Sequence, residues 1–419
     1  MVPLQRRELL ASVGIATLAG CTSLRPPGGG TSGVSNQYPN GWPQAGFDAR
    51  NSRNPEHDSP QDSATERWRF ERETVGFLFD EPAVAVTEDD VIVGTVDGTI
   101  FTIDIESGES SRLVSLSSSA YRSIAAPIRG IASTGESLYV TSDGLYKLDR
   151  TTGDDIWHFA VDPEDNQANL LETNPTISDD SVYIPGYGVH ALDRETGEQQ
   201  WHFKTDGLPD EIDPAEGDIS WFVPRAPAVT SEQLFCSTYG STLYAIDRDT
   251  GEESWRYDTA TREMRGTPVT QDGIVYQHMA DRVYAFDAST GDIEWDTSLT
   301  DYQRTQFELA PALTDDRLYL GVSPVLGFDI QNGETDWIGI DDPTGFGRFT
   351  SPVVTSDMLY TTDLLQGHLY AFSLDDEGIA WNFEESSPQG GENCVITTED
   401  LVCYLTTRGD LIAFESGTT

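Results

Sequence analysis

Short runs of apolar residues recur along this chain from about residue 82 and are bounded by Gly, Asp and Thr. Some runs alternate apolar with polar residues and others are continuously apolar, while none repeats with the 3.6-residue period of a helix. Both patterns are typical of β-strands that lie half or fully inside a core. We therefore expect an all-β chain with many short strands.

The predicted strands belong to a repeating unit. Each unit opens with Pro and small apolar residues, passes an acidic turn, and continues with two strands, a Thr-Gly turn and a Trp. One unit runs from Pro227 through Asp247, Thr250 and Gly251 to Trp255. Eight units, separated by 41 to 52 residues, begin at Pro82, Pro127, Pro175, Pro227, Pro268, Pro311, Pro352 and Cys394. A period in the forties with about four short strands is typical of β-propeller blades.

The residues that define the repeat have structural roles. Gly in the Thr-Gly pair can take a positive φ in the hairpin between the third and fourth strands. The preceding Asp can accept backbone N–H bonds of that turn. The Trp offers a large apolar face that can pack between blades. We assign this packing role to Trp68, Trp157, Trp201, Trp255, Trp295, Trp337 and Trp381.

The last unit is incomplete, because it reaches residues 411–414 and then ends without a fourth strand or a Trp. An isolated segment upstream of the first unit, residues 65–70 with Trp68, matches the missing strand. A closed ring has no exposed sheet edges. We therefore predict an eight-bladed β-propeller of four-stranded antiparallel blades, with the last blade closed by an N-terminal strand.

The N-terminal residues 1–20 are predicted to be an export signal rather than part of the fold. Arg6-Arg7 precedes an apolar run over residues 11–19 and resembles a twin-arginine signal, while Leu18-Ala19-Gly20-Cys21 resembles a lipobox. Cys21 would then carry the lipid, and the alternative is an ordinary secretory signal with a chance cysteine. Residues 21–41 indicate a flexible tether, and residues 42–419 the propeller.

The charge of the chain restricts its partners. Asp and Glu number 71 against 25 Lys and Arg, which gives a net charge of −46. A field this negative repels nucleic acid and anionic lipid headgroups, so we predict no nucleic-acid partner and membrane contact through the lipid anchor only. Because the acidic residues are spread along the whole chain, we interpret them as a halophilic adaptation to very high salt.

The string Ala-x-Asp-x-x-Thr-Gly-x-x-x-Trp resembles the pyrroloquinoline-quinone (PQQ) type repeat of quinoprotein dehydrogenases and of BamB-like lipoproteins. The opening segment from Trp42 to Asp48 resembles the lead-in of such proteins. The enzymes of this family usually carry two adjacent cysteines against the cofactor, together with ligands for Ca²⁺. Here Cys21, Cys236, Cys394 and Cys403 are all separated, so the BamB-like branch fits better and we expect no bound cofactor.

The search for other chemistry identifies no catalytic or metal-binding motif in the sequence. His158 and His202 each follow a repeat Trp. We interpret them as equivalent positions of the repeat rather than as metal ligands. Acidic pairs such as Asp89-Asp90 are interpreted as solvated turns. Cys394 and Cys403 flank a tight turn, where they could lie opposite each other as a disulfide or remain two reduced thiols.

One constellation remains as a candidate binding site. Several arginines precede a blade-opening Pro, in loops that would all emerge on one face around the channel mouth: Arg122, Arg225, Arg265 and Arg348. Guanidinium groups bind carboxylate and phosphate through paired hydrogen bonds. Trp221 and Phe222, which look exposed in a long loop of the same face, would add apolar contact. The alternative is that each Arg neutralises neighbouring carboxylates.

Together these patterns predict a lipid-anchored binding or scaffolding protein on the extracytoplasmic face of the cell membrane, with protein or peptide partners in the envelope. A quinone-dependent dehydrogenase or other redox enzyme using the channel is the first alternative. A structural envelope component without a small ligand is the second.

Overall fold

The computed structural model of the chain describes eighteen stretches of residues, and all structural statements below concern these. They are residues 44–55, 57–60, 63–71, 83–116, 127–160, 173–186, 188–207, 221–240, 242–259, 266–279, 281–300, 310–322, 324–339, 349–363, 367–375, 378–384, 394–406 and 409–417. The predicted signal (1–20) and tether (21–41) lie outside them. Within these stretches, no helix is long and apolar enough to cross a membrane.

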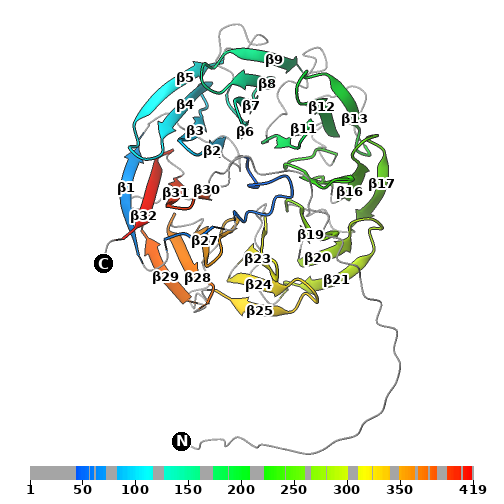
Figure 1. The fold of residues 1–419 in the computed structure, drawn as a ribbon. Coiled ribbons are helices and arrows are strands. Elements are labelled where there is room, and N and C mark those ends of the chain that lie inside the picture. The colour runs from blue at the N-terminus through cyan, green and yellow to red at the C-terminus, as the bar shows by residue number, and fades with distance from the viewer. Residues whose placement is uncertain are drawn as a thin grey trace, which may run out of the picture.

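The described residues form 32 strands in eight four-stranded antiparallel sheets that surround a central axis (Figure 1). In chain order the strands are β1 (Ala64–Phe70), β2 (Val84–Val86), β3 (Asp90–Gly94), β4 (Thr99–Asp104), β5 (Ser110–Ser115), β6 (Gly130–Thr134), β7 (Ser137–Thr141), β8 (Gly144–Asp149), β9 (Asp155–Ala160), β10 (Thr176–Ile177), β11 (Ser181–Gly186), β12 (Gly188–Asp193), β13 (Gln199–Phe203), β14 (Ala228–Val229), β15 (Gln233–Ser237), β16 (Thr242–Asp247), β17 (Glu253–Asp258), β18 (Val269–Gln271), β19 (Ile274–Met279), β20 (Arg282–Asp287), β21 (Ile293–Ser298), β22 (Ala312–Leu313), β23 (Arg317–Gly321), β24 (Val325–Asp329), β25 (Thr335–Ile338), β26 (Val353–Val354), β27 (Met358–Thr362), β28 (Leu369–Ser373), β29 (Gly378–Phe383), β30 (Cys394–Thr397), β31 (Leu401–Leu405) and β32 (Leu411–Ser416).

Seven of the sheets are built from four consecutive strands, and we number these blades 1 to 7 from β2–β5 to β26–β29. The eighth has the order β1-β32-β31-β30, so the N-terminal strand is its outermost member. Trp68 pairs with Ala413, and Gly417 donates its N–H to the Ser63 carbonyl at the end of the β1–β32 pair. The predicted eight blades and their closure by an N-terminal strand are therefore confirmed.

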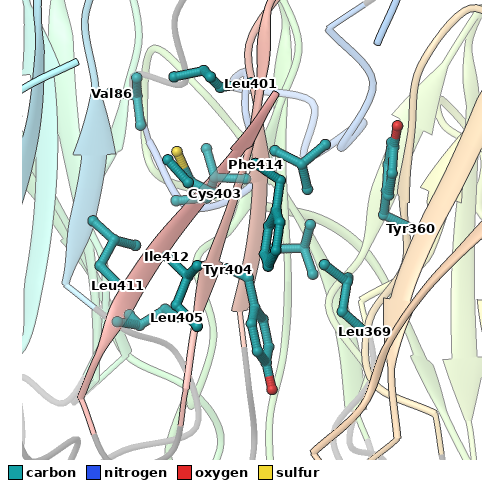
Figure 2. Close-up of a cluster of buried hydrophobic side chains, with 14 of the residues drawn as sticks. Val86, Tyr360, Leu369, Leu401, Cys403, Tyr404, Leu405, Leu411, Ile412 and Phe414 are labelled. Atoms are coloured by element: carbon teal, nitrogen blue, oxygen red, sulfur yellow. The ribbon is translucent and has the colours of Figure 1, made fainter. Parts of the chain in front are cut away.

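The core of the propeller lies between neighbouring blades, because each strand directs alternate side chains to the blade on either side. Figure 2 shows the packing of blade 8, where Cys403, Tyr404 and Phe414 lie between blade 7 (Tyr360) and blade 1 (Val86). All five of these side chains are buried. The continuous apolar runs of the sequence are thus strands covered on both faces.

The Trp of one blade docks onto the Thr-Gly turn of the next. The indole of Trp201 lies against Gly251, and its Nε1–H donates to the Arg248 carbonyl at 2.9 Å. Gly251 has φ 72°, and a Cβ there would lie 2.6 Å from the ring. This position therefore requires glycine for its conformation and also for the close approach of the indole. The same contact links Trp68 to Gly108, and further pairs are Trp157–Gly197, Trp255–Gly291 and Trp295–Gly333.

The residue opposite the Trp is small in most blades, for example Ala245 opposite Trp255. A β-bulge adjoins this pair in each of the seven blades that carry the Trp. Blade 1 has Arg112 at this place, with a bulge beside it, and Leu113 and Val114 lie against Gly153 of blade 2 instead. The interblade contact is therefore kept where the Trp is absent.

Candidate functional site: the central channel and its rim

The innermost strands of the eight blades face the axis of the ring, and a segment of the N-terminal region runs between them (Figure 1). We call residues 44–55 and 57–60 the channel strap. Almost all residues from Gln44 to Pro55 are buried or half-buried, although this segment has no regular secondary structure. The channel is thus lined by blades and also occupied by the protein's own chain.

The strap is held by a series of equivalent contacts. In four successive blades, the backbone N–H of an innermost-strand residue donates to a strap carbonyl: Val229 to Ala49 (2.6 Å), Thr270 to Arg50 (3.1 Å), Leu313 to Ser52 (2.9 Å) and Val354 to Arg53 (3.1 Å). In blade 3, the Ile177 N–H donates to Oε1 of Gln44 at 2.8 Å. The strap therefore contacts blades 3 to 7 in order.

Strap side chains reinforce this path. Nδ2 of Asn51 donates to the carbonyls of Ala226 (3.1 Å) and Pro268 (3.2 Å), and so connects blades 4 and 5. Nδ2 of Asn54 donates to the Leu313 carbonyl at 3.0 Å. Nε of Arg53 donates to the Pro352 carbonyl at 2.8 Å. All of these donors are buried, where a hydrogen bond to an otherwise unpaired carbonyl is costly to lose.

The strap has an unusual backbone. Phe47, Asn51 and Arg53 have positive φ values of 73°, 59° and 51°. This region is favourable for Asn but strained for Phe and Arg. The Asp48 carboxylate stabilises the turn by accepting the N–H groups of Arg50 and Ser52, both at 3.0 Å. A strained backbone in a channel is compatible with folding only because the surrounding blades fix it.

Of the four predicted rim arginines, the structure describes one. Arg225 directly precedes the start of blade 4 and is 5% exposed. Arg122, Arg265 and Arg348 lie outside the described residues. The structure therefore neither brings the four arginines together nor separates them, but Arg225 is buried rather than on an open surface.

The prediction that Trp221 and Phe222 are exposed is wrong. Their exposed fractions are 5% and 4%. The rings contact each other edge to face, Phe222 stacks on Tyr239 at a centroid distance of 5.7 Å, and Thr205 Oγ1 donates to the Trp221 carbonyl. Two aromatic side chains bury enough apolar surface to hold the described residues 221–223 against the blades, where the Val223 N–H donates to the Gly186 carbonyl.

The histidines of the repeat are stacked side chains, in agreement with their interpretation as repeat positions. His190 and His202 stack with ring centroids 3.8 Å apart, and His158 stacks on Tyr146 at 4.0 Å. Burial, with a smaller effect of His202, lowers the pKa of His190 to about 4. In the described part of the chain, no group of three or more His, Cys, Asp or Glu side chains is arranged to hold a metal ion.

The cysteines of the last blade are thiols in the structure. Cys394 pairs with Leu405 and Cys403 with Ile396, so the two cysteines are not directly opposite each other as a bridge would need. Burial raises the pKa of the Cys403 thiol to about 12, and burial also raises that of Cys236. Thiols that stay protonated are poor nucleophiles and poor metal ligands.

A polar groove of about 160 Å³ lies at the junction of blades 8 and 1, lined by Arg67, Glu88, Ile105, Glu106, Thr398, Glu399, Asp400 and Leu401. Arg67 is engaged there, because it donates to the Glu106 carbonyl at 3.0 Å and pairs with Glu415 at 3.2 Å. The guanidinium thus connects the N-terminal strand β1 to both neighbours, and its contacts serve the closure of the ring.

The PQQ and Ca²⁺ that the repeat resemblance implies do not fit the residues at the axis. The sequence has no two adjacent cysteines. The buried strap side chains Asn51, Arg53 and Asn54 donate to carbonyls in or next to the innermost strands, so the protein's own chain already takes up these groups at the axis. Sequence reasoning missed this arrangement, because the only signal was the lead-in from Trp42 to Asp48, and its resemblance did not indicate where the segment lies.

Solved structures with the same fold include enzymes and non-enzymes. The quinohemoprotein alcohol dehydrogenase from Comamonas testosteroni has a TM-score of 0.69 at 12% identity, covering 92% of this chain and 82% of that one. The computationally designed Ika8 protein has a TM-score of 0.63 at 14% identity (85% and 100%). BamB from Moraxella catarrhalis has a TM-score of 0.50 at 14% identity (84% and 100%). At these identities the likeness concerns the fold alone.

No curated protein matches the sequence. The family model described as outer membrane protein assembly factor BamB, by contrast, matches residues 115–218 and 188–418, which is well over half of the chain. These residues cover most of the blades, including the Trp and Thr-Gly positions that join them. This chain therefore belongs to the PQQ-type β-propeller family that this BamB model defines.

Proposed function

We propose that the protein is an exported, lipid-anchored binding or scaffolding protein with protein or peptide partners in the cell envelope. Membership in the BamB family supports a binding or scaffold role. The observation that carries the proposal is the channel strap, because this segment runs between the innermost strands (Figure 1) and bonds to them where a small ligand or cofactor would have to bind. Partners would then bind on the faces of the ring.

The anchor in this proposal is Cys21 in the string Leu18-Ala19-Gly20-Cys21. We expect Cys21→Ser to release the protein from the membrane fraction into the medium, because the thiol that would carry the lipid is absent. Cys236→Ser is the matched control, since Cys236 is buried in blade 4 and has no part in anchoring. Fractionation followed by immunoblotting measures the result, and a Cys21→Ser protein that stays in the membrane fraction would refute the lipobox.

The partner surface in this proposal is the loop face, where Arg122, Arg265 and Arg348 precede blade openings. We expect their replacement by Ala to reduce by at least fivefold the amount of the main partner captured from native membranes. A control triple variant, Arg69→Ala with Arg282→Ala and Arg317→Ala, removes the same charge from residues that pair with Glu66, Asp296 and Asp336. Equal capture by both triple variants would contradict a role for the rim.

A further inference from the structure

The propeller has few ways to connect blades that are not neighbours. In repeat architectures each unit contacts the units beside it, and stability is a sum of such local terms. The Trp–Gly docking described above is of this kind, because each indole reaches one adjacent blade only. A ring with these contacts alone can open at any one blade junction without disturbing the blades on the far side.

The channel strap differs from every one of these contacts. Within nine residues, from Ala49 to His57, its carbonyls accept N–H groups from four different blades. Asn51 alone bonds to two of them through one amide group. Beyond the axis, Ser59 and Pro60 accept the Tyr360 hydroxyl, and Pro60 also accepts the Trp381 indole N–H. The strap then leads into β1, which completes blade 8.

We propose that the channel strap is a conformational latch that couples blades 3 to 7 into one cooperative unit. The inner-edge N–H groups of Val229, Thr270, Leu313 and Val354 lose their acceptors together when the strap leaves the channel. The strained φ values of Phe47 and Arg53 can be held only while these contacts exist. Gln44, the first described residue of the strap, is bonded to the innermost strand of blade 3.

The strap does not reach every blade. The equivalent inner-edge residues of blades 1 and 8 are Val86 and Thr397, which directly precede the first hairpin turn as Val229 does. Neither has a hydrogen bond to a described strap residue. Phe47 of the strap does belong to the apolar cluster shared by blades 7, 8 and 1. The backbone amides of Val86 and Thr397 therefore serve as a reference for the loss of strap hydrogen bonds, and not for the loss of every strap contact.

The test is hydrogen–deuterium exchange of the full-length protein, read by mass spectrometry on short peptides. In the wild type, the backbone amides of Val229, Thr270, Leu313 and Val354 are followed in four separate peptides. We expect these four amides to exchange at the same rate in mild denaturant. Asn51→Gly keeps the positive φ accessible but removes the side-chain amide. Because the latch releases all four acceptors together, the backbone amides of Val229, Thr270, Leu313 and Val354 should all exchange at least tenfold faster, and by a similar factor. Peptides with Val86 and Thr397 should be unchanged.

A second variant makes the test independent of any single residue. Asn54→Ala removes the bond to the Leu313 carbonyl in blade 6, and a cooperative latch should again accelerate all four backbone amides together. Acceleration at Leu313 alone would contradict the coupling. Arg50→Ala is the control, because its guanidinium pairs with Asp48 within the strap and its side chain is one-third exposed. Unchanged exchange in both Asn variants, or the same acceleration in all eight blades, would overturn the latch.

Discussion

Deletion of residues 1–75 is expected to abolish cooperative folding. The deletion removes the channel strap and β1, so blade 8 keeps three strands and the last Trp docking contact is lost. The exposed edge of β32 would then offer unpaired backbone groups for association. We expect aggregation, or a broad thermal transition without a sharp midpoint, in calorimetry and in circular dichroism.

Two shorter deletions locate the cause. Removal of residues 1–37 leaves the strap and Trp68 in place and should not change the melting temperature. Removal of residues 1–62 keeps β1 but not the strap, and should give a closed ring of intermediate stability. A fully stable protein without Trp68 would show that the closing strand is assigned wrongly.

Trp201→Phe is expected to destabilise the protein considerably more than Trp337→Phe. Both indoles are buried, so both variants lose a similar apolar surface. Trp201 donates Nε1–H to the Arg248 carbonyl, whereas Nε1 of Trp337 has no hydrogen-bond partner. Loss of a buried bond that leaves its acceptor unpaired costs about 1–3 kcal/mol. Release of an unpaired buried N–H is close to neutral.

The measurement is the free energy of unfolding from denaturant titration, made in the same high-salt buffer for both variants. Trp201→Ala and Trp337→Ala show how much unfolding free energy is lost when the whole side chain is removed, because truncation of a buried Trp typically costs about 3–5 kcal/mol. The difference between the two Phe variants should then be a clear fraction of this cost. Equal losses would mean that the indole bond to the next blade does not stabilise the ring.

The fold could be predicted from the sequence because the repeat carries it. The same residue types recur at equivalent positions in each blade. An Asp, a Thr-Gly turn and a Trp therefore locate three strands without any knowledge of contacts. The closing strand was visible for the same reason, since residues 65–70 carry the Trp that the last unit lacks. The repeated motif thus predicts the order of the strands in each blade as well as their positions in the sequence.

The site was less accessible to such reasoning. The strap has no periodic pattern, and its main contacts use backbone carbonyls, which any residue provides. The bond from Asn51 to Pro268 joins residues more than 200 positions apart. Trp221 and Phe222 misled because hydrophobic residues in a long loop can cover each other as well as a partner. Charge and aromatic content alone do not separate these outcomes.

We propose that this propeller binds partners and does not use its channel for quinone chemistry. The decisive experiment is titration of the purified protein with PQQ in the presence of Ca²⁺, followed by visible absorbance and by dye-linked oxidation of alcohols and sugars. We expect no saturable change in absorbance and no turnover. Stoichiometric binding of PQQ with dye-linked turnover would show that the channel is a quinone site.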